Sequence, residues 1–464
     1  MSERTVIDVS QVVEQQKLGG FLVGLVVISW IITFFDGFDS QAIAFAAPYL
    51  SNQYHLDRIM MGNIFSMGLV GALIGGFGFG YLGDRIGRRP AIILATAAFG
   101  LLTLAFVFAD SYASLLALRL IDGIALGGML PLSWALNIEY VPKRYRSTVV
   151  TVIMIGYSVG IAVGGPAANW LIPQYGWQSL FAVGGALSLV AALALVLILP
   201  ESARFLASKG WQPRRVADLL RRLTGKAVPA DAQFVAADEV GQAKHFNPAL
   251  LFRDQLRFIT PLLWLAYIAS SIAVFFLATW TPLVFEALNF TRSQAALAAS
   301  VNAAAGAVGG LLLMRFTDNI GAIAVTAMPL LAIPLLLIAA FVDVGQGGFF
   351  ALFALIALFL IGGHFGLHSI AGIFYPSAYR GNGAGWAISV AKIGSIAGPF
   401  AAGLILSTNL PVRYIFAVLA ICPAVFVVCI FIVGRIHSSM LRGVTQTPPA
   451  SQMAEAARSS LARL

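Results

Sequence analysis

Long apolar runs recur along the whole chain, and they constrain its fold more than any other feature of the sequence. Each run is about twenty residues or longer, the length that a helix needs to cross the hydrocarbon core of a bilayer. With 59% hydrophobic residues, only 11% charged residues and a mean hydropathy of +0.87, the chain lies outside the range of soluble globular proteins. The sequence predicts an all-α membrane protein with twelve spanning helices, near residues 20–48, 60–82, 90–109, 113–138, 146–171, 177–199, 258–285, 293–315, 320–342, 348–374, 382–407 and 411–434.

The basic residues, which give the chain a net charge of +9, fall in short blocks between these runs. Such blocks are typical of loop charges that set membrane topology, so we expect no nucleic-acid partner. Only Arg58, Arg292 and Arg413 lie in the loops that follow odd-numbered spans. The pattern predicts a multi-pass protein of a cell inner membrane with both termini in the cytoplasm.

One long break in hydropathy separates two groups of six spans. We therefore expect a cytoplasmic N-terminus (1–19), an N-terminal six-helix bundle (20–199), a cytoplasmic linker (200–257), a C-terminal six-helix bundle (258–434) and a cytoplasmic tail (435–464). Within the linker, residues 214–223 alternate arginines with leucines at helical spacing, which is typical of an amphipathic helix at a membrane surface.

The two halves are related by a constant offset of 234 residues, which aligns Asp84 with Asp318 and Arg146 with Arg380. Matches at element junctions without slippage indicate a duplicated parallel repeat. This arrangement is typical of secondary transporters whose halves rock against each other.

Two carboxylates, Asp36 and Asp39, interrupt the first span near its centre. A spacing of three keeps them on one face of a helix. An intramembrane Asp costs roughly 2.5–3.5 kcal/mol on insertion scales, so such residues face a bundle interior or an aqueous cavity. Gly37 between them leaves room for a ligand or a neighbouring helix. We expect the pair to bind and release protons.

Several motifs carry a resemblance to a known family. The sequences GYLGDRIGRR (80–89), RLIDGIALGG (119–128) and PESARFL (200–206) resemble motifs of the major facilitator superfamily. The DGFD sequence in the first span is similar to that of the aromatic acid:proton symporter family, importers of benzoate-like carboxylates. The resemblance implies two rocking six-helix bundles, with helices one, four, seven and ten lining a central cavity.

Arg119 and Lys392 are the cations within spans, and we expect them to bind the substrate carboxylate. Arg119 has an alternative partner in Asp122, three residues on, which would form a structural pair on the same helix. His364 and His368 share one face of the tenth span and are candidates for contact with the substrate. Phe38 and Trp280 are candidates for the apolar walls of the site.

The loop after the second span is a candidate gate, because a carboxylate among arginines at a helix terminus makes a contact that can form and break. In the second repeat Ala322 and Ile323 stand where Arg88 and Arg89 stand in the first, which predicts a weaker gate there. The expected gating residues are Asp84, Arg85, Arg88, Arg89, Glu139, Arg146, Asp318 and Arg380.

These observations predict a proton-coupled symporter that imports a small aromatic or related organic carboxylate by alternating access. Two alternatives remain, namely a proton-coupled sugar or polyol transporter and a membrane sensor that binds substrate without moving it. No nucleophile with a base, metal cluster or phosphate loop is evident in the sequence, so we expect no enzyme, cofactor or metal site. The expected partners are protons, the organic acid and membrane lipid, with the monomer as the working unit.

Overall fold

A computed structural model describes residues 6–16, 19–226, 228–229, 232–236, 247–320, 323–370, 374–375, 380–408 and 410–445. Within the helices it does not describe the side chains of residues 147, 314–320, 323–324, 368–370, 380 and 437–445.

The described residues contain eleven helices that are long and apolar enough to cross a membrane, together with one shorter apolar helix at 325–341. The prediction of twelve spans is confirmed, with α12 as the short one. In the first half the spans are α2 (Gly20–Gln53), α3 (Arg58–Ile86), α4 (Arg88–Ala105), α5 (Tyr112–Tyr140), α6 (Arg146–Tyr175) and α7 (Gln178–Ile198). In the second half they are α10 (Leu256–Ala287), α11 (Arg292–Ile320), α12 (Ile323–Phe341), α13 (Gly345–Ile370), α14 (Arg380–Leu406) and α16 (Ile421–Thr445), the last preceded by α15 (Ile415–Leu419). Short 3₁₀ turns lie at Phe106–Phe108, Lys143–Tyr145, Pro248–Phe252 and Val412–Tyr414.

Local sequence explains where some of these helices begin. The Asp57 side chain accepts a hydrogen bond from the Met60 backbone N–H at 2.7 Å and caps α3. Ser111 and Ser114 form a reciprocal capping box at the start of α5. Both caps satisfy backbone donors that a helix N-terminus leaves without an intrahelical partner.

The two halves pack in the same way, as the repeat in the sequence predicts. Both α3 and α11 begin at an arginine, with an offset of 234 residues. In the first half a Cβ on Gly75 would collide with the carbonyl of Ile124, and in the second half a Cβ on Gly309 would collide with the carbonyl of Leu358. These positions carry glycine because α3 lies against α5, and α11 against α13, at backbone contact distance.

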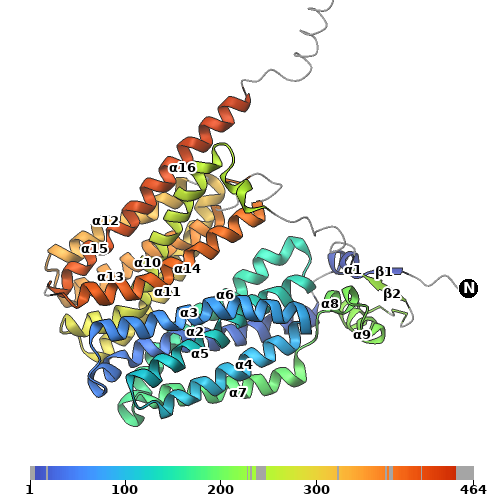
Figure 1. Ribbon diagram of the computed structural model, residues 1–464, viewed down its shortest axis with the longest axis horizontal. Coiled ribbons are helices and arrows are strands. Elements are labelled where there is room, and N and C mark those ends of the chain that lie inside the picture. The colour runs from blue at the N-terminus through green and yellow to red at the C-terminus, as the bar shows by residue number, and fades with distance from the viewer. Residues whose placement is uncertain are drawn as a thin grey trace, which may run out of the picture.

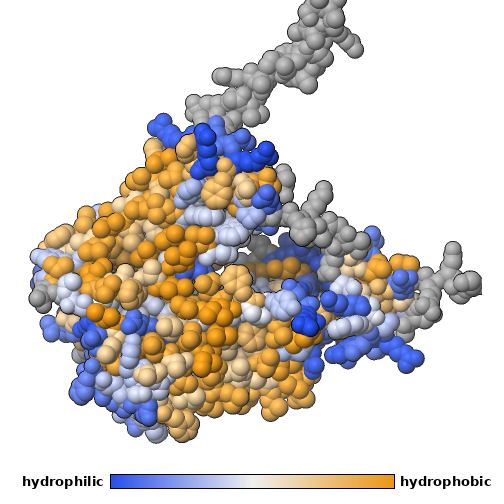
Figure 2. Space-filling model, in the orientation of Figure 1, coloured by the Kyte–Doolittle hydropathy of each residue, from blue (hydrophilic) through white to orange (hydrophobic). Residues whose placement is uncertain are grey.

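The halves meet at one end and diverge at the other (Figure 1). We call the end where they meet the sealed side and the end that carries α1 (Val9–Gln15), α8 (Ala203–Ser208) and α9 (Pro213–Thr224) the linker side. On the sealed side Ser66 Oγ donates to the Ile396 carbonyl at 2.7 Å, and Asn169 Nδ2 donates to the Ser293 carbonyl at 3.1 Å. Figure 2 shows the surface hollowed between the two bundles towards the linker side, and hydrophobic residues spread over both bundles on the face in view. The conformation is therefore closed at the sealed side and open at the linker side.

The N-terminal segment and the linker fold together on the linker side of the first half. Strand β1 (Val6–Asp8) pairs in parallel with β2 (Gln233–Val235), an element that the all-α prediction lacks. In α9 the apolar side chains of Val216, Leu219 and Leu220 are buried in a core cluster that includes Val9 of α1. The interpretation of this helix as a membrane-surface helix is therefore wrong, because its apolar face packs on protein.

Candidate functional site

The two carboxylates of α2 lie inside the first bundle. Asp36 is 0% exposed and Asp39 is 1% exposed, and none of their four carboxylate oxygens has a hydrogen-bond partner. A Cβ on Gly37 would collide with the carbonyl of Tyr157 on α6, so this glycine makes room for a neighbouring helix. A buried carboxylate without a donor is costly in its charged form, and binding of a proton removes that charge.

Arg119 on α5 is 7% exposed, and its charge acts on Asp39. Its NH1 donates to Oδ2 of Asp122 at 3.3 Å and its NH2 donates to the Ser40 carbonyl at 3.4 Å, while Nε has no partner. The pairing with Asp122 is the alternative that the sequence left open. Gly68 on α3 lies so close that a Cβ there would be 2.6 Å from Arg119 Nε. Sequence reasoning missed Gly68, although it belongs to a run of small residues on α3.

Asp122 adds a third acid to the cluster. It is 0% exposed, and Thr103 at the end of α4 donates to its Oδ1 at 3.5 Å. The charges of Asp36 and Asp39 act on Asp122, as does that of Arg119. Three carboxylates from two helices therefore share one electrostatic site.

Lys392 approaches this site from α14 in the other half. It is solvent-exposed, unlike the acids, yet it and Asp36 act on each other electrostatically. Tyr157 of α6, on which Asp36 also acts, has its Oη 3.2 Å from Ser40 Oγ, and Ser40 donates to the Gly37 carbonyl at 2.9 Å. The fold thus brings Asp36, Arg119 and Lys392 together from three helices and both halves.

The charges of this cluster do not balance when every group is ionised. Asp36, Asp39 and Asp122 supply three negative charges, whereas Arg119 and Lys392 supply two positive charges. A monoanionic ligand increases the imbalance, and a proton on a carboxyl reduces it. Chemically, the arrangement is suited to binding a carboxylate together with one or more protons.

The remaining predicted substrate residues are placed less directly. His364 on α13 is 9% exposed, and its Nδ1 lies 2.9 Å from Ser270 Oγ on α10. Phe38 packs against Gly184 of α7, and Trp280 is 0% exposed with Nε1 donating to the Pro399 carbonyl at 3.0 Å. In this conformation both aromatic residues are packing residues, and their contact with a substrate stays a prediction. The side chain of His368 lies outside the described residues.

The gating motif forms a charge cluster on the linker side of the first half. Arg88 joins two acids: its NH1 contacts Asp84 Oδ1 at 2.5 Å and its Nε contacts Glu139 Oε1 at 2.9 Å. The carboxylate that caps the next helix is Glu201, which is not among the predicted gating residues. Glu201 Oε1 accepts from the backbone N–H of Arg88 at 2.9 Å and of Arg89 at 3.1 Å, at the start of α4. Its position in the PESARFL motif, directly after a span, was the available signal.

The other predicted gating residues serve helix ends or remain undescribed. Arg89 Nε donates to the Leu199 carbonyl at 2.8 Å, at the end of α7, and Arg146 Nε donates to the Val141 carbonyl at 3.1 Å. Gly87 has φ +107° and sits against Glu201, where a Cβ would collide. Arg85 is exposed at the end of α3. The side chains of Asp318 and Arg380 lie outside the described residues.

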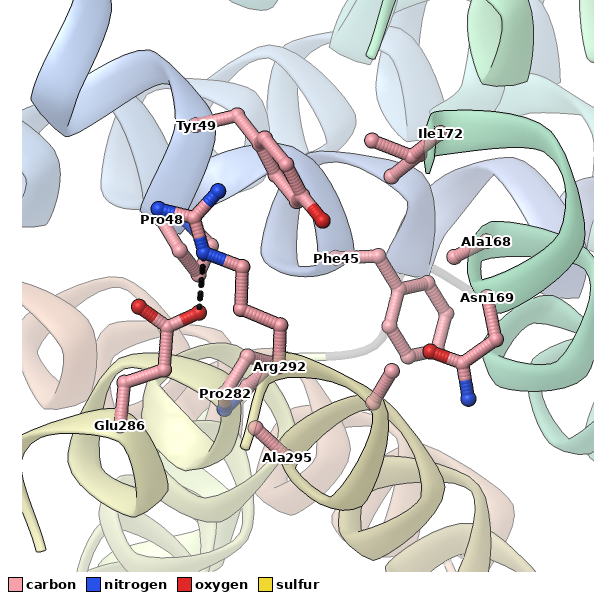
Figure 3. A pocket seen from close by; sticks show the side chains of 11 residues that line it. Phe45, Pro48, Tyr49, Ala168, Asn169, Ile172, Pro282, Glu286, Arg292 and Ala295 are labelled. Carbon is pink, nitrogen blue, oxygen red and sulfur yellow. Dashed lines mark ion pairs between the residues drawn. The ribbon is translucent and has the colours of Figure 1, made fainter. Parts of the chain in front are cut away.

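A pocket on the sealed side lies between α2 and α6 of the first half and α10 and α11 of the second (Figure 3). Arg292 Nε pairs with Glu286 Oε1 at 3.3 Å, and the guanidinium lies 4.3 Å from the centre of the Tyr49 ring. Glu286 also acts electrostatically on Arg58 of α3. Sequence reasoning placed Arg58 and Arg292 on this side and missed their partners.

Three comparisons with known proteins agree with this geometry. A sequence profile described as Major Facilitator Superfamily matches residues 29–374. A gallate transporter of Pseudomonas putida is 30% identical over 456 residues, which cover 96% of this chain and 98% of that protein. A 4-hydroxybenzoate transporter of Acinetobacter baylyi is 29% identical over 434 residues, which cover 93% of this chain and 95% of that protein.

Among solved structures, the inward-open conformation of the xylose transporter XylE from E. coli superposes with a TM-score of 0.69. It is 16% identical and the match covers 89% of this chain and 96% of that chain, so the likeness concerns the fold alone. The described part of the chain forms eleven long spans and one short one, arranged as two repeated bundles. The chain belongs to the major facilitator superfamily, whose members are transporters and not enzymes, and it resembles the aromatic acid:proton symporter family.

Proposed function

We propose that this protein imports a small aromatic carboxylate by symport with protons across a bacterial inner membrane. The observation that carries the proposal is the buried cluster in which Asp36 and Asp39 lie without hydrogen-bond partners beside Arg119 and Lys392. The relatives named as gallate and 4-hydroxybenzoate transporters support an aromatic acid as substrate. Fixed cations inside the membrane suit a carboxylate and are not needed for a neutral sugar.

The linker side faces the cytoplasm in this proposal. It carries the arginine blocks of α9 and of the gating motif, whereas Arg58, Arg292 and Arg413 lie on the sealed side. This asymmetry follows the tendency of basic residues to remain in the cytoplasm. Both termini are then cytoplasmic, the conformation described is open to the inside, and the monomer is the working unit.

The substrate carboxylate binds between the two halves, with Lys392 as its first cation. Lys392 is exposed on the face of α14, and Asp36 across the gap is its electrostatic partner. A substrate anion replaces Asp36 beside Lys392 when Asp36 takes up a proton. Proton binding and substrate binding thereby favour each other, which is what symport requires.

Arg119 supplies the second cation and ties the site to the first bundle. Its two hydrogen bonds are long, at 3.3 and 3.4 Å, and its Nε has no partner. A carboxylate that accepts two parallel hydrogen bonds satisfies a guanidinium better than these contacts do. Arg119 therefore has unused capacity for Asp39 or for the substrate.

The test is counterflow in proteoliposomes that contain the purified protein. Vesicles loaded with unlabelled 4-hydroxybenzoate are diluted into labelled 4-hydroxybenzoate, and gallate and D-xylose are tested in parallel. We expect transient accumulation of an aromatic acid and none of xylose. Counterflow of xylose alone would establish the sugar alternative, and binding of the acid without counterflow would establish the sensor.

Two further measurements test coupling and the role of Lys392. An inward pH gradient should drive net accumulation of the substrate. Coupling to more than one proton should give an inward positive current on a solid-supported membrane, since each charge moved across the membrane contributes about 2.3 kcal/mol per 100 mV.

Lys392→Ala should weaken substrate affinity about tenfold or more, because a charged hydrogen bond contributes about 1.5–3 kcal/mol. Lys209→Ala, at an exposed position after α8, is the matched control. Uptake that ignores the pH gradient would contradict proton coupling.

A further inference from the structure

The salt bridge of Arg119 within the described residues is made with Asp122 on its own helix, and not with the acids of α2. Asp122 is 0% exposed, and its second oxygen accepts from Thr103 of α4. The proposed function uses Asp36 and Asp39 and assigns Asp122 nothing. A third buried carboxylate needs an explanation, because an acid in such a place is costly unless it is paired or protonated.

The contacts of Arg119 indicate that the pair is not a rigid structural bond. The NH1–Oδ2 distance of 3.3 Å is a single contact and not the two-pronged one that a guanidinium forms with a well-placed carboxylate. The NH2 contact to the Ser40 carbonyl is 3.4 Å, and Nε, buried against Gly68, has no acceptor. Arg119 thus contacts Asp122 through NH1 and α2 through the Ser40 carbonyl, and its charge also acts on Asp39 of α2.

Several other charged or titratable groups act on this pair or on its neighbours. From α2, Asp36 and Asp39 act on Asp122, and Asp39 is acted on by Arg119. From α6, Tyr157 is acted on by Asp36 and Arg119, and from α14, Lys392 acts on Asp36. Three acids lie near one guanidinium, so protonation of any one of them removes its attraction for Arg119 and leaves Arg119 to the other two.

We propose that Asp122 is a third proton-binding residue of the transport cycle and a positioning residue for Arg119. With Asp122 ionised, Arg119 is held on α5. When a proton binds to a carboxylate oxygen of Asp122, that oxygen becomes neutral and Arg119 is free to bind the substrate carboxylate. Release of the proton to the cytoplasm returns Arg119 to Asp122 and expels the anion. This inference rests on the proposed function and adds a proton site to it.

The discriminating variant is Asp122→Asn, which keeps the shape of the side chain and an acceptor for Thr103 but binds no proton. The probe is labelled 4-hydroxybenzoate, whose affinity is measured against pH by scintillation proximity on the reconstituted protein. A single linked proton makes affinity fall by about tenfold per pH unit above the titration of its site. We expect the variant to lose one such proton dependence and to bind more tightly than wild type at alkaline pH. Asp218→Asn, at an exposed position on α9, should leave the profile unchanged.

An infrared measurement tests the proton site without any substrate. Infrared spectra of the wild-type protein in lipid, recorded over a pH titration, should contain a protonated-carboxyl band that is absent from the spectra of Asp122→Asn. If the variant and wild type share the same bands and the same pH profile, Asp122 is a structural partner and the inference is overturned while transport stands. If the wild type neither binds nor exchanges aromatic acids, the proposed function fails, and the infrared band still decides whether Asp122 takes up a proton.

Discussion

At the scale of single residues, Asp36 and Asp39 are the proposed proton-binding residues. They are buried, and among the described residues the charge of Asp36 is favoured by Lys392 and that of Asp39 by Arg119 and Thr103. Asp36→Asn and Asp39→Asn should each abolish accumulation driven by a pH gradient, since an amide carries no proton. At least one variant should retain exchange, measured as counterflow. Full accumulation by the double variant would exclude both residues from coupling.

Gly68 leaves the space that the Arg119 side chain occupies. A methyl group on Gly68 would lie 2.6 Å from Arg119 Nε, well inside van der Waals contact, so Gly68→Ala should displace the guanidinium. We expect at least a tenfold loss of uptake rate, because a charged hydrogen bond contributes about 1.5–3 kcal/mol. Gly78→Ala on the same helix is the matched control, because a Cβ there meets no atom within 4 Å. Equal uptake by the two variants would contradict this role of Gly68.

At the scale of elements, the proposed linker-side gate includes the start of α4. Glu201 accepts from three backbone N–H groups, those of Arg88, Arg89 and Ser202. Glu201→Gln should lower the stability of the protein by about 1–2 kcal/mol, through a weaker cap and the loss of a negative charge at the positive end of α4. Thermal unfolding of the purified variant measures this loss.

Asp84→Asn provides the contrast. The Asp84 side chain is 72% exposed, and exposed ion pairs contribute less than about 1 kcal/mol, so stability should change little. Its transport rate should still fall, because the Asp84–Arg88 contact at the end of α3 must form and break as the halves move. Equal thermal destabilisation by both substitutions would mean that Asp84 also holds the resting structure.

At the scale of the whole molecule, the proposed alternating access requires the sealed side to open while the linker side closes. Arg292 of the second half lies over the Tyr49 ring of the first half and pairs with Glu286. Arg292→Ala should remove about 0.5–1 kcal/mol from the seal, the usual contribution of an exposed cation–π contact. The population should shift towards the outward-open state by a factor of about 2–5.

Pulsed electron resonance between spin labels at Asn52 and Gln346, which are exposed on the sealed side of opposite halves, measures this shift. The labels are introduced after replacement of Cys422 and Cys429 by serine. Arg413→Ala is the control, because Arg413 pairs with Asp343 within the second half at 3.1 Å. An unchanged distance distribution in Arg292→Ala would show that the seal does not depend on this contact.

The sequence by itself determined the membrane spans, the repeat and the depth of the ionisable residues. These follow from hydropathy, length and spacing, which are local properties that a bilayer selects whatever the helices later pack against. The offset of 234 residues recurs in the starts of α3 and α11 and of α6 and α14. The spacing of Arg119 and Asp122 already made their pairing one of two alternatives. For the same reason the short α12 was predicted as a span.

Only the tertiary structure decided which partners meet across helices. The apolar face of α9 packs on α1 and not on lipid. Trp280 is buried beside Phe65, and Glu201 caps α4. The approach of Lys392 to Asp36 likewise depends on how two separate bundles are placed. The physical reason is that rotation of each helix about its axis and the relative position of the halves are set by many weak, non-local contacts, which leave no periodic signal in a single sequence.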